Sequence, residues 1–233
     1  MTLADIALIV GGYLFGCLPF AAALARRRGL DLSQEKDAHI ALWHNVSRTQ
    51  ASVAGFVDLI KGSIPMLVGF GFSFSTEVVT FTGVAAVVGQ MWPPSPSWPG
   101  EKGNTTGAGV VLTVALIYHA YLILLAVIPF ATGAALRYYT FASGDERLHK
   151  PTHPLALALP VGMFLGFAVA PIASLCSGQP KSMTLGLLIL FATIVVRRMT
   201  CDLKGDVKKG GNIVRILANR FLFDQPAIDE IRP

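Results

Sequence analysis

Most of this sequence consists of long apolar runs, and their lengths restrict the folds that the chain can adopt. A helix needs about 20 mostly apolar residues to cross the hydrocarbon core of a bilayer, which is roughly 30 Å thick. Because 53% of the 233 residues are hydrophobic and only 14% are charged, a water-soluble fold is excluded. The sequence therefore predicts an all-α integral membrane protein. Its apolar runs are residues 6–25, 51–72, 78–92, 107–140, 153–176 and 183–199.

The run 107–140 is too long for one ordinary crossing. As a single helix it would extend roughly 50 Å, so we expect a hairpin of two short or tilted helices, with Pro129 and Gly133 as the break points. One continuous helix is the alternative. Counted as two, this run brings the total to about seven transmembrane helices in a single membrane domain, residues 1–233.

The basic residues predict the orientation of the chain. Of the 19 Lys and Arg residues, all but Lys61 and Lys181 lie in the connections 26–50, 93–106 and 137–152 or at residues 197–233. Positive charge collects on the cytoplasmic side of membrane proteins. We therefore expect the N-terminus outside, the C-terminus inside, and a cytoplasmic tail over residues 201–233. Because the first run is followed rather than preceded by arginines, we read it as a retained helix and not as a signal peptide.

Composition also excludes several classes of function. A net charge of +5 could indicate nucleic-acid binding, but the basic residues lie between apolar runs, where membrane topology explains them. The cysteines, Cys17, Cys176 and Cys201, show no metal-ligand spacing and lie in or beside apolar runs. We expect no nucleic-acid partner, no metal and no cofactor, and we interpret the cysteines as packing residues.

Two ionisable residues lie inside the second apolar run. Asp58 and Lys61 are three positions apart, which places them on one face of a helix. Charged groups at membrane depth are costly, so they should pair and face the bundle interior. Such a pair is either purely structural or part of a functional site.

The segment 89–109 is rich in proline and glycine and lies between two apolar runs. Its prolines end the preceding helix near Trp92, and its glycines let backbone N–H groups turn toward a ligand beside Lys102. A glycine-rich turn that enters a helix N-terminus suits a phosphate, although the spacing does not fit the nucleotide P-loop. The alternative is a flexible loop between helices. Local chemistry favours the phosphate site and the flexible loop about equally.

Several motifs occur together in the order and spacing of a known family. Residues 89–93 and 99–106 resemble Gly-His-x-[Trp/Phe]-Pro followed by Lys-Gly-Gly-Lys-Gly-Val-Ala-Thr, residues 58–62 resemble Asp-x-x-Lys-Gly, and residues 16–20 resemble Gly-Ser-Ile-Pro-Phe. The chain thus resembles the bacterial membrane acyl-phosphate:glycerol-3-phosphate acyltransferases, as a divergent member.

The resemblance implies a function and a set of site residues. The chain would transfer a fatty acyl group from acyl phosphate to glycerol 3-phosphate at the cytoplasmic face of the bacterial inner membrane, giving lysophosphatidic acid for phospholipid synthesis. Its partners would be these two substrates and membrane lipid. The residues implied in catalysis are Lys102, Arg48, Asp58 and Lys61. Those implied in phosphate binding are Gly100, Gly103, Thr105, Thr106, Asn45, Asn212 and Arg215.

The chain departs from the family pattern at several motif positions, among them the following four. Ala38 replaces a serine, Gln90 a histidine, Pro99 a lysine and Lys209 a histidine. These substitutions favour a second hypothesis, a catalytically impaired relative that binds phosphorylated lipid or a membrane partner. A small transporter is a third, since the spans and buried charges allow it, although the sequence contains no visible internal repeat.

Overall fold

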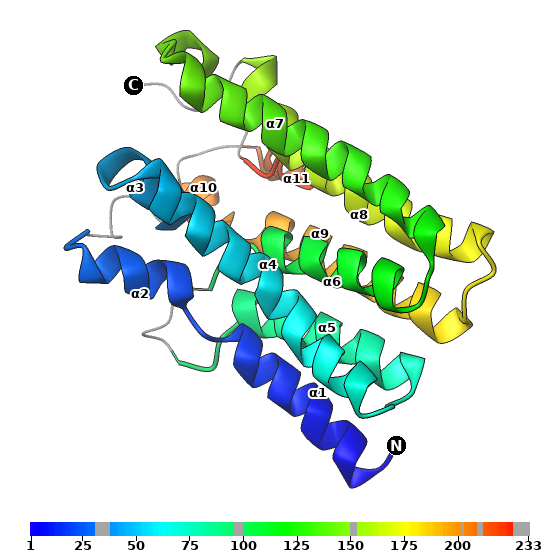
Figure 1. Ribbon diagram of the computed structural model, residues 1–233. Helices are drawn as coiled ribbons and strands as arrows, with labels where there is room; N and C mark the ends of the chain where they lie inside the picture. The colour runs from blue at the N-terminus through cyan, green and yellow to red at the C-terminus, as the bar shows by residue number, and fades with distance from the viewer. Residues whose placement is uncertain (31–37, 96–99, 150–152, 202, 209–211, 226–233) are drawn as a thin grey trace.

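The computed structural model describes residues 1–30, 38–95, 100–149, 153–201, 203–208 and 212–225. These residues form helices joined by turns and no strand, and the helices pack side by side as a bundle (Figure 1). The α-helices are α1 Leu3–Gly16, α2 Phe20–Arg27, α3 Ala38–Asn45, α4 Arg48–Gly71, α5 Thr76–Met91, α6 Asn104–Ile117, α7 Val127–Ser143, α8 Ala158–Cys176, α9 Lys181–Thr200, α10 Leu203–Lys208 and α11 Ile213–Phe223. The 3-10 helices are η1 Tyr121–Ala126, η2 Glu146–His149 and η3 Pro154–Leu157.

Five helical segments in the described part of the chain are long and apolar enough to cross a membrane. α5 and α6 are also apolar, but they have only 16 and 14 residues, fewer than the roughly 20 of a typical span. The all-α membrane class is thus confirmed, whereas the seven crossings and the orientation of the termini stay predictions. The five long segments are Leu3–Arg27, Arg48–Gly71, Tyr121–Ser143, Pro154–Cys176 and Lys181–Lys208.

The first apolar run forms two helices, so the prediction of one helix was wrong. α1 ends at Gly16 and α2 begins at Phe20, with Pro19 between them. Proline has no N–H with which to continue the helix. The carbonyl of Leu18, at this break, accepts a hydrogen bond from Lys61 Nζ at 3.0 Å, so α4 binds to the chain where α1 stops.

The run 107–140 forms two helices, as one of the two alternatives predicted, but the break points were wrong. α6 ends at Ile117, and the chain turns at 118–120, where His119 has a φ of 52°. Pro129 lies instead in the first turn of α7, a position that tolerates proline. A Cβ added to Gly133 would lie 3.2 Å from the Cα of Gly162, so this glycine serves the close packing of α7 on α8.

The cysteine interpretation holds for one residue. Cys17 is buried beside the break after α1, but Cys176 is exposed and Cys201 is half-buried. Burial therefore supports the packing interpretation for Cys17 and not for the exposed Cys176.

Close helix crossings fix the start of α6 in the bundle. A Cβ on Gly62 of α4 would lie 2.2 Å from the carbonyl oxygen of Thr106, and one on Gly109 of α6 would lie 2.0 Å from that of Leu59. Small residues let helix backbones approach in this way within membranes. The main apolar core lies beside this crossing, where α5, α6, α8 and α9 meet.

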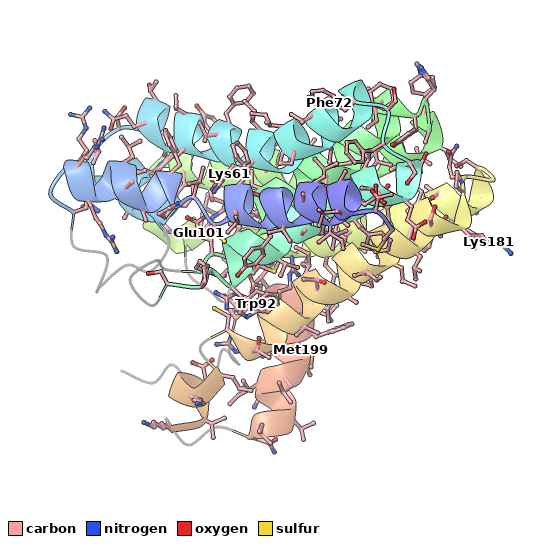
Figure 2. All side chains as sticks on the ribbon, turned by 90° about the horizontal axis from the view of Figure 1, so that it is seen from below. Lys61, Phe72, Trp92, Glu101, Lys181 and Met199 are labelled. Atoms are coloured by element: carbon pink, nitrogen blue, oxygen red, sulfur yellow. The ribbon has the colours of Figure 1, made fainter. Side chains whose placement is uncertain are left out.

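The described parts of the connections predicted to be cytoplasmic lie at one end of the bundle. α2, α3 and α10 gather there, while the α4–α5 and α8–α9 turns lie at the other end, near the N-terminus (Figure 1). Glu101 and Trp92 are at the first end, and Lys181 is at the second (Figure 2).

Candidate functional site

The glycine loop, residues 100–103, needs its glycines because it packs tightly onto the end of α5. A Cβ on Gly100 would lie 2.2 Å from the Met91 carbonyl oxygen, which no side chain tolerates. Gly103 has a φ of 71°, in the left-handed region that favours glycine, and it precedes the first residue of α6. These two glycines therefore set the path by which the chain enters α6.

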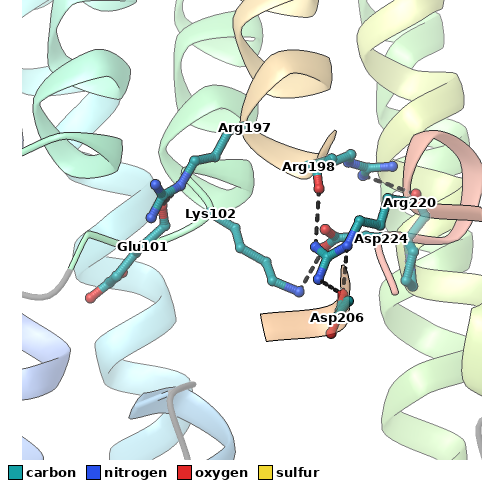
Figure 3. Close-up of polar contacts among 8 residues, drawn as sticks. Glu101, Lys102, Arg197, Arg198, Asp206, Arg220 and Asp224 are labelled. Carbon is teal, nitrogen blue, oxygen red and sulfur yellow. Dashed lines mark hydrogen bonds and ion pairs between the residues drawn. The ribbon is translucent and has the colours of Figure 1, made fainter. Parts of the chain in front are cut away.

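Arg197, near the end of α9, binds backbone carbonyls of the loop with its guanidinium. Its Nη2 donates to the Gly100 carbonyl at 2.7 Å and its Nε to the Glu101 carbonyl at 3.1 Å. The same guanidinium lies over the Trp92 ring, 5.6 Å from its centroid. The loop carbonyls thus face α9, and Figure 3 shows the contact of Arg197 with Glu101.

The first turn of α6 is uncapped. Among the described residues, no side-chain hydrogen bond caps the helix at Gly103, and the first N–H groups of a helix have no intrahelical acceptors. The helix dipole adds partial positive charge at this end. With Lys102 two residues before α6, the arrangement suits an anion.

Glu101 does not compete for Lys102. Its Oε2 accepts a hydrogen bond from Gln90 Nε2 at 2.8 Å, and the Glu101 and Lys102 side chains point in different directions (Figure 3). Gln90, which stands at a histidine position of the family motif, therefore helps to hold the Glu101 carboxylate away from the lysine.

Lys102 forms an ion pair that sequence reasoning missed. Its Nζ lies 2.7 Å from Oδ2 of Asp224, and the two side chains are 44% and 4% exposed. Asp224 follows α11, at the other end of the chain, and nothing in the surrounding sequence identifies it as a partner of the loop.

Asp224 is held in place by the attachment of α11 to the end of α9. Arg220 Nε donates to Asp206 Oδ2 at 2.9 Å, and its Nη1 donates to the Arg198 carbonyl at 3.3 Å. Arg220 and Asp206 are both buried. The Asp224 N–H donates to the Arg220 carbonyl at 3.1 Å, which joins Asp224 to this arrangement (Figure 3).

The predicted pairing of Asp58 with Lys61 is confirmed. Lys61 Nζ lies 2.6 Å from Asp58 Oδ1, and both side chains are almost fully buried. The hydroxyl of Thr106 donates to the Asp58 carbonyl at 2.7 Å. Thr106 therefore ties α6 to α4, while Thr105, beside it, is half-buried.

Two predicted site residues, Asn45 and Arg48, have their contacts in α3. Arg48 is exposed at the start of α4, with its guanidinium 5.6 Å from the centroid of the Trp43 ring. Asn45 Nδ2 donates to the Ala41 carbonyl at 3.1 Å. Within the described residues, no hydrogen bond or ion pair joins Arg48 or Asn45 to the glycine loop.

The predicted site residues Asn212 and Arg215 lie at the start of α11. Asn212 caps this helix, because its Oδ1 accepts from the N–H of Val214 at 3.0 Å, and Arg215 is exposed in the first turn. Of the substituted motif positions, Pro99, Lys209 and the side chain of Ala38 lie outside the described residues.

Arg197 is the second loop partner that sequence reasoning missed. The pair Arg197 and Arg198 at the end of an apolar run was interpreted only as positive charge on the cytoplasmic side. A basic residue at the end of an apolar run can also predict a contact with a loop, since a cation at the end of one helix can reach the connections of its neighbours.

A family model described as glycerol-3-phosphate acyltransferase matches residues 6–209. A glycerol-3-phosphate acyltransferase of Aquifex aeolicus is 35% identical over 112 residues, which cover 46% of this chain and 58% of that protein. One of Bacillus cytotoxicus is 31% identical over 141 residues, covering 58% and 69%. The chain thus spans about three-fifths of the first relative's length. Asn212, Arg215 and Asp224 lie beyond the family match.

Similarity extends to a solved structure. A crystal structure of PlsY, described as an integral membrane glycerol 3-phosphate acyltransferase in its glycerol 3-phosphate form, aligns with a TM-score of 0.62 at 21% identity. The alignment covers 93% of this chain and 94% of that one. At this identity the likeness establishes the fold alone.

Proposed function

Since the chain belongs to the glycerol-3-phosphate acyltransferase family, we propose that it transfers a fatty acyl group from acyl phosphate to glycerol 3-phosphate and releases lysophosphatidic acid. The reaction would take place at the cytoplasmic face of the bacterial inner membrane, with membrane lipid as the third partner. The observation that carries this proposal is the uncapped start of α6 beside Lys102, at the end of the bundle where the basic connections meet.

The reaction requires positioning rather than a covalent intermediate. An acyl phosphate is a mixed anhydride, so its carbonyl carbon is already activated. The glycerol hydroxyl oxygen bonds to that carbon, the bond from carbon to the phosphate oxygen breaks, and phosphate leaves with the electron pair and takes up, directly or through water, the proton that the hydroxyl loses. The protein must align two phosphorylated substrates and stabilise the departing charge.

We assign the phosphate to Lys102 and the backbone of Gly100, Gly103 and Thr105. The ammonium supplies a point charge, and the first N–H groups of α6 supply oriented donors. In this proposal Arg48 and Arg215, together with Asn45 and Asn212, line the rest of a cationic surface at the same end of the bundle. Asp58, Lys61 and Thr106 support the site indirectly, because their contacts join α4 to α6 and to the break after α1.

The test is turnover by purified protein in phospholipid nanodiscs, with radiolabelled glycerol 3-phosphate and a panel of acyl phosphates and acyl thioesters. We expect labelled lysophosphatidic acid with acyl phosphate as the donor. Replacing Lys102 by alanine removes one charge-assisted contact, so kcat/KM should fall roughly ten- to a hundredfold. Lys181→Ala is the matched control, because it removes the same charge at the opposite end of the bundle (Figure 2). Equal effects of the two substitutions would exclude the Lys102 site.

The non-catalytic alternative has one specific observation in its favour, which is that Asp224 already neutralises Lys102. In that case the chain would bind phosphorylated lipid without turning it over. The turnover experiment in nanodiscs decides between the enzyme and the non-catalytic alternative. Binding of glycerol 3-phosphate without product from any donor would establish the alternative.

A further inference from the structure

We propose that Asp224 determines the affinity of the Lys102 site, because its carboxylate holds the position on the ammonium that a phosphate oxygen of the ligand would take. This inference rests on the proposed function, since it assigns the phosphate of glycerol 3-phosphate to Lys102. It assigns control of phosphate affinity to a residue beyond the family match, which ends at residue 209.

The geometry of the ion pair supports direct competition. A distance of 2.7 Å between Lys102 Nζ and Asp224 Oδ2 is that of a charge-assisted hydrogen bond, the same contact that a phosphate oxygen makes with lysine. The Lys102 side chain is 44% exposed, so a ligand can approach it from solvent. A ligand phosphate must therefore displace the carboxylate or bind close to its negative charge, and either lowers its affinity.

Burial of the carboxylate strengthens its hold on Lys102. The Asp224 side chain is only 4% exposed, and its Oδ1 has no hydrogen-bond partner among the described residues. A desolvated carboxylate with one unsatisfied oxygen depends strongly on its remaining partner. In Asp224 the ion-paired partner is the Lys102 ammonium, and the buried Arg198 guanidinium is a second cation that acts on the same carboxylate.

The segment that carries Asp224 is a packed part of the bundle. Ile216 of α11 is fully buried, and the Phe221 ring lies 4.9 Å from that of Phe164 in α8, measured between centroids. Arg220 links α11 to Asp206 and to the end of α9. The carboxylate is thus presented to Lys102 by a docked helix, so its effect is built into the fold.

The deciding experiment compares ligand binding to the full chain and to its Asp224→Asn variant. Asp224 has a φ of 56°, and asparagine is well tolerated in this left-handed conformation. Isothermal titration with glycerol 3-phosphate, and separately with inorganic phosphate, should show both dissociation constants lowered roughly two- to tenfold in the variant. The KM for glycerol 3-phosphate should fall with them.

Two further variants make the result specific. Asp145→Asn removes the same charge from an exposed site at the same end of the bundle, with no contact to Lys102, so it should leave both constants unchanged. In a chain that carries Lys102→Ala, adding Asp224→Asn should give a smaller gain than in the full chain, because the ammonium for which the two anions compete is absent and only their mutual repulsion is relieved. Asp224→Gly, which also suits the left-handed backbone, replaces the asparagine variant if that one fails to fold.

Unchanged or weaker binding in the Asp224 variants would overturn the inference. If the unsubstituted chain still makes lysophosphatidic acid in that case, the proposed function stands and only the role of Asp224 is wrong. Absence of both binding and turnover in every variant would overturn the proposed function together with this inference.

Discussion

Several charged residues in this protein each have a specific partner. Asp58 and Lys61 neutralise each other within an apolar run, and Lys61 also binds the Leu18 carbonyl where Pro19 ends α1. Arg197 binds the glycine loop, and Asp224 pairs with Lys102. Because an unpaired charge in a low-dielectric environment is costly, removing one member of such a pair affects the other member most.

Asp58→Asn should destabilise the fold by about 3–5 kcal/mol, the usual cost of leaving one partner of a buried ion pair unmatched. Adding Lys61→Met to this variant should recover part of the loss, since no unpaired ammonium remains. Thermal unfolding of the purified variants in detergent measures both effects. Strictly additive losses in the double variant would show that the two side chains are not energetic partners. A stable double variant that binds glycerol 3-phosphate but does not turn it over would give the pair a functional role.

At the scale of helices, glycine decides how closely two elements approach. Gly62 and Gly109 let α4 and α6 cross with almost no side chain between them, and this contact positions the start of α6. Gly55 lies on the same helix as Gly62, but an added Cβ there would meet nothing within 4 Å. Gly55 and Gly62 thus separate the effect of packing from the effect of helix propensity.

Gly62→Ala should lower stability by about 1–3 kcal/mol, because the new methyl group overlaps the Thr106 carbonyl and forces α6 away from α4. Gly55→Ala should be neutral or stabilising by up to about 1 kcal/mol, since alanine favours the helix at no steric cost. The melting temperatures of the two variants in the same detergent provide the comparison. Equal shifts would mean that close packing at Gly62 does not control the crossing.

At the scale of the whole molecule, the described basic connections and the glycine loop lie at one end of the bundle (Figure 1), and α11 is attached to the end of α9. The prediction that this end is cytoplasmic rests on the distribution of Lys and Arg. It also determines the side from which water-soluble glycerol 3-phosphate would reach Lys102.

Single cysteines introduced into a cysteine-free background test this orientation. A cysteine at position 145 should react with a membrane-impermeant maleimide only after the cells are opened, whereas one at position 178, in the turn between α8 and α9, should react in intact cells. The first position lies beside η2 at the end that holds the glycine loop, and the second at the opposite end. Labelling of position 145 in intact cells would reverse the predicted topology.

The sequence by itself determined the class of the protein and its local pairings. The lengths of the apolar runs match the thickness of a bilayer, which predicts membrane helices without reference to tertiary contacts. Asp58 and Lys61 could be paired from their spacing because one helical turn brings them together. The family motifs were recognised in the same way, since they are short stretches of consecutive residues.

The tertiary structure decided which residues meet across the bundle. Arg197 lies almost a hundred positions from the loop that it binds, and Asp224 lies even farther from Lys102. The place of the break before η1 was likewise set by packing, because Gly133 is needed for the contact of α7 with α8 and Pro129 fits a first helical turn. Such contacts depend on the order and tilt of packed helices. Neither is encoded in local periodicity, so the partner of Lys102 could be found only from the fold.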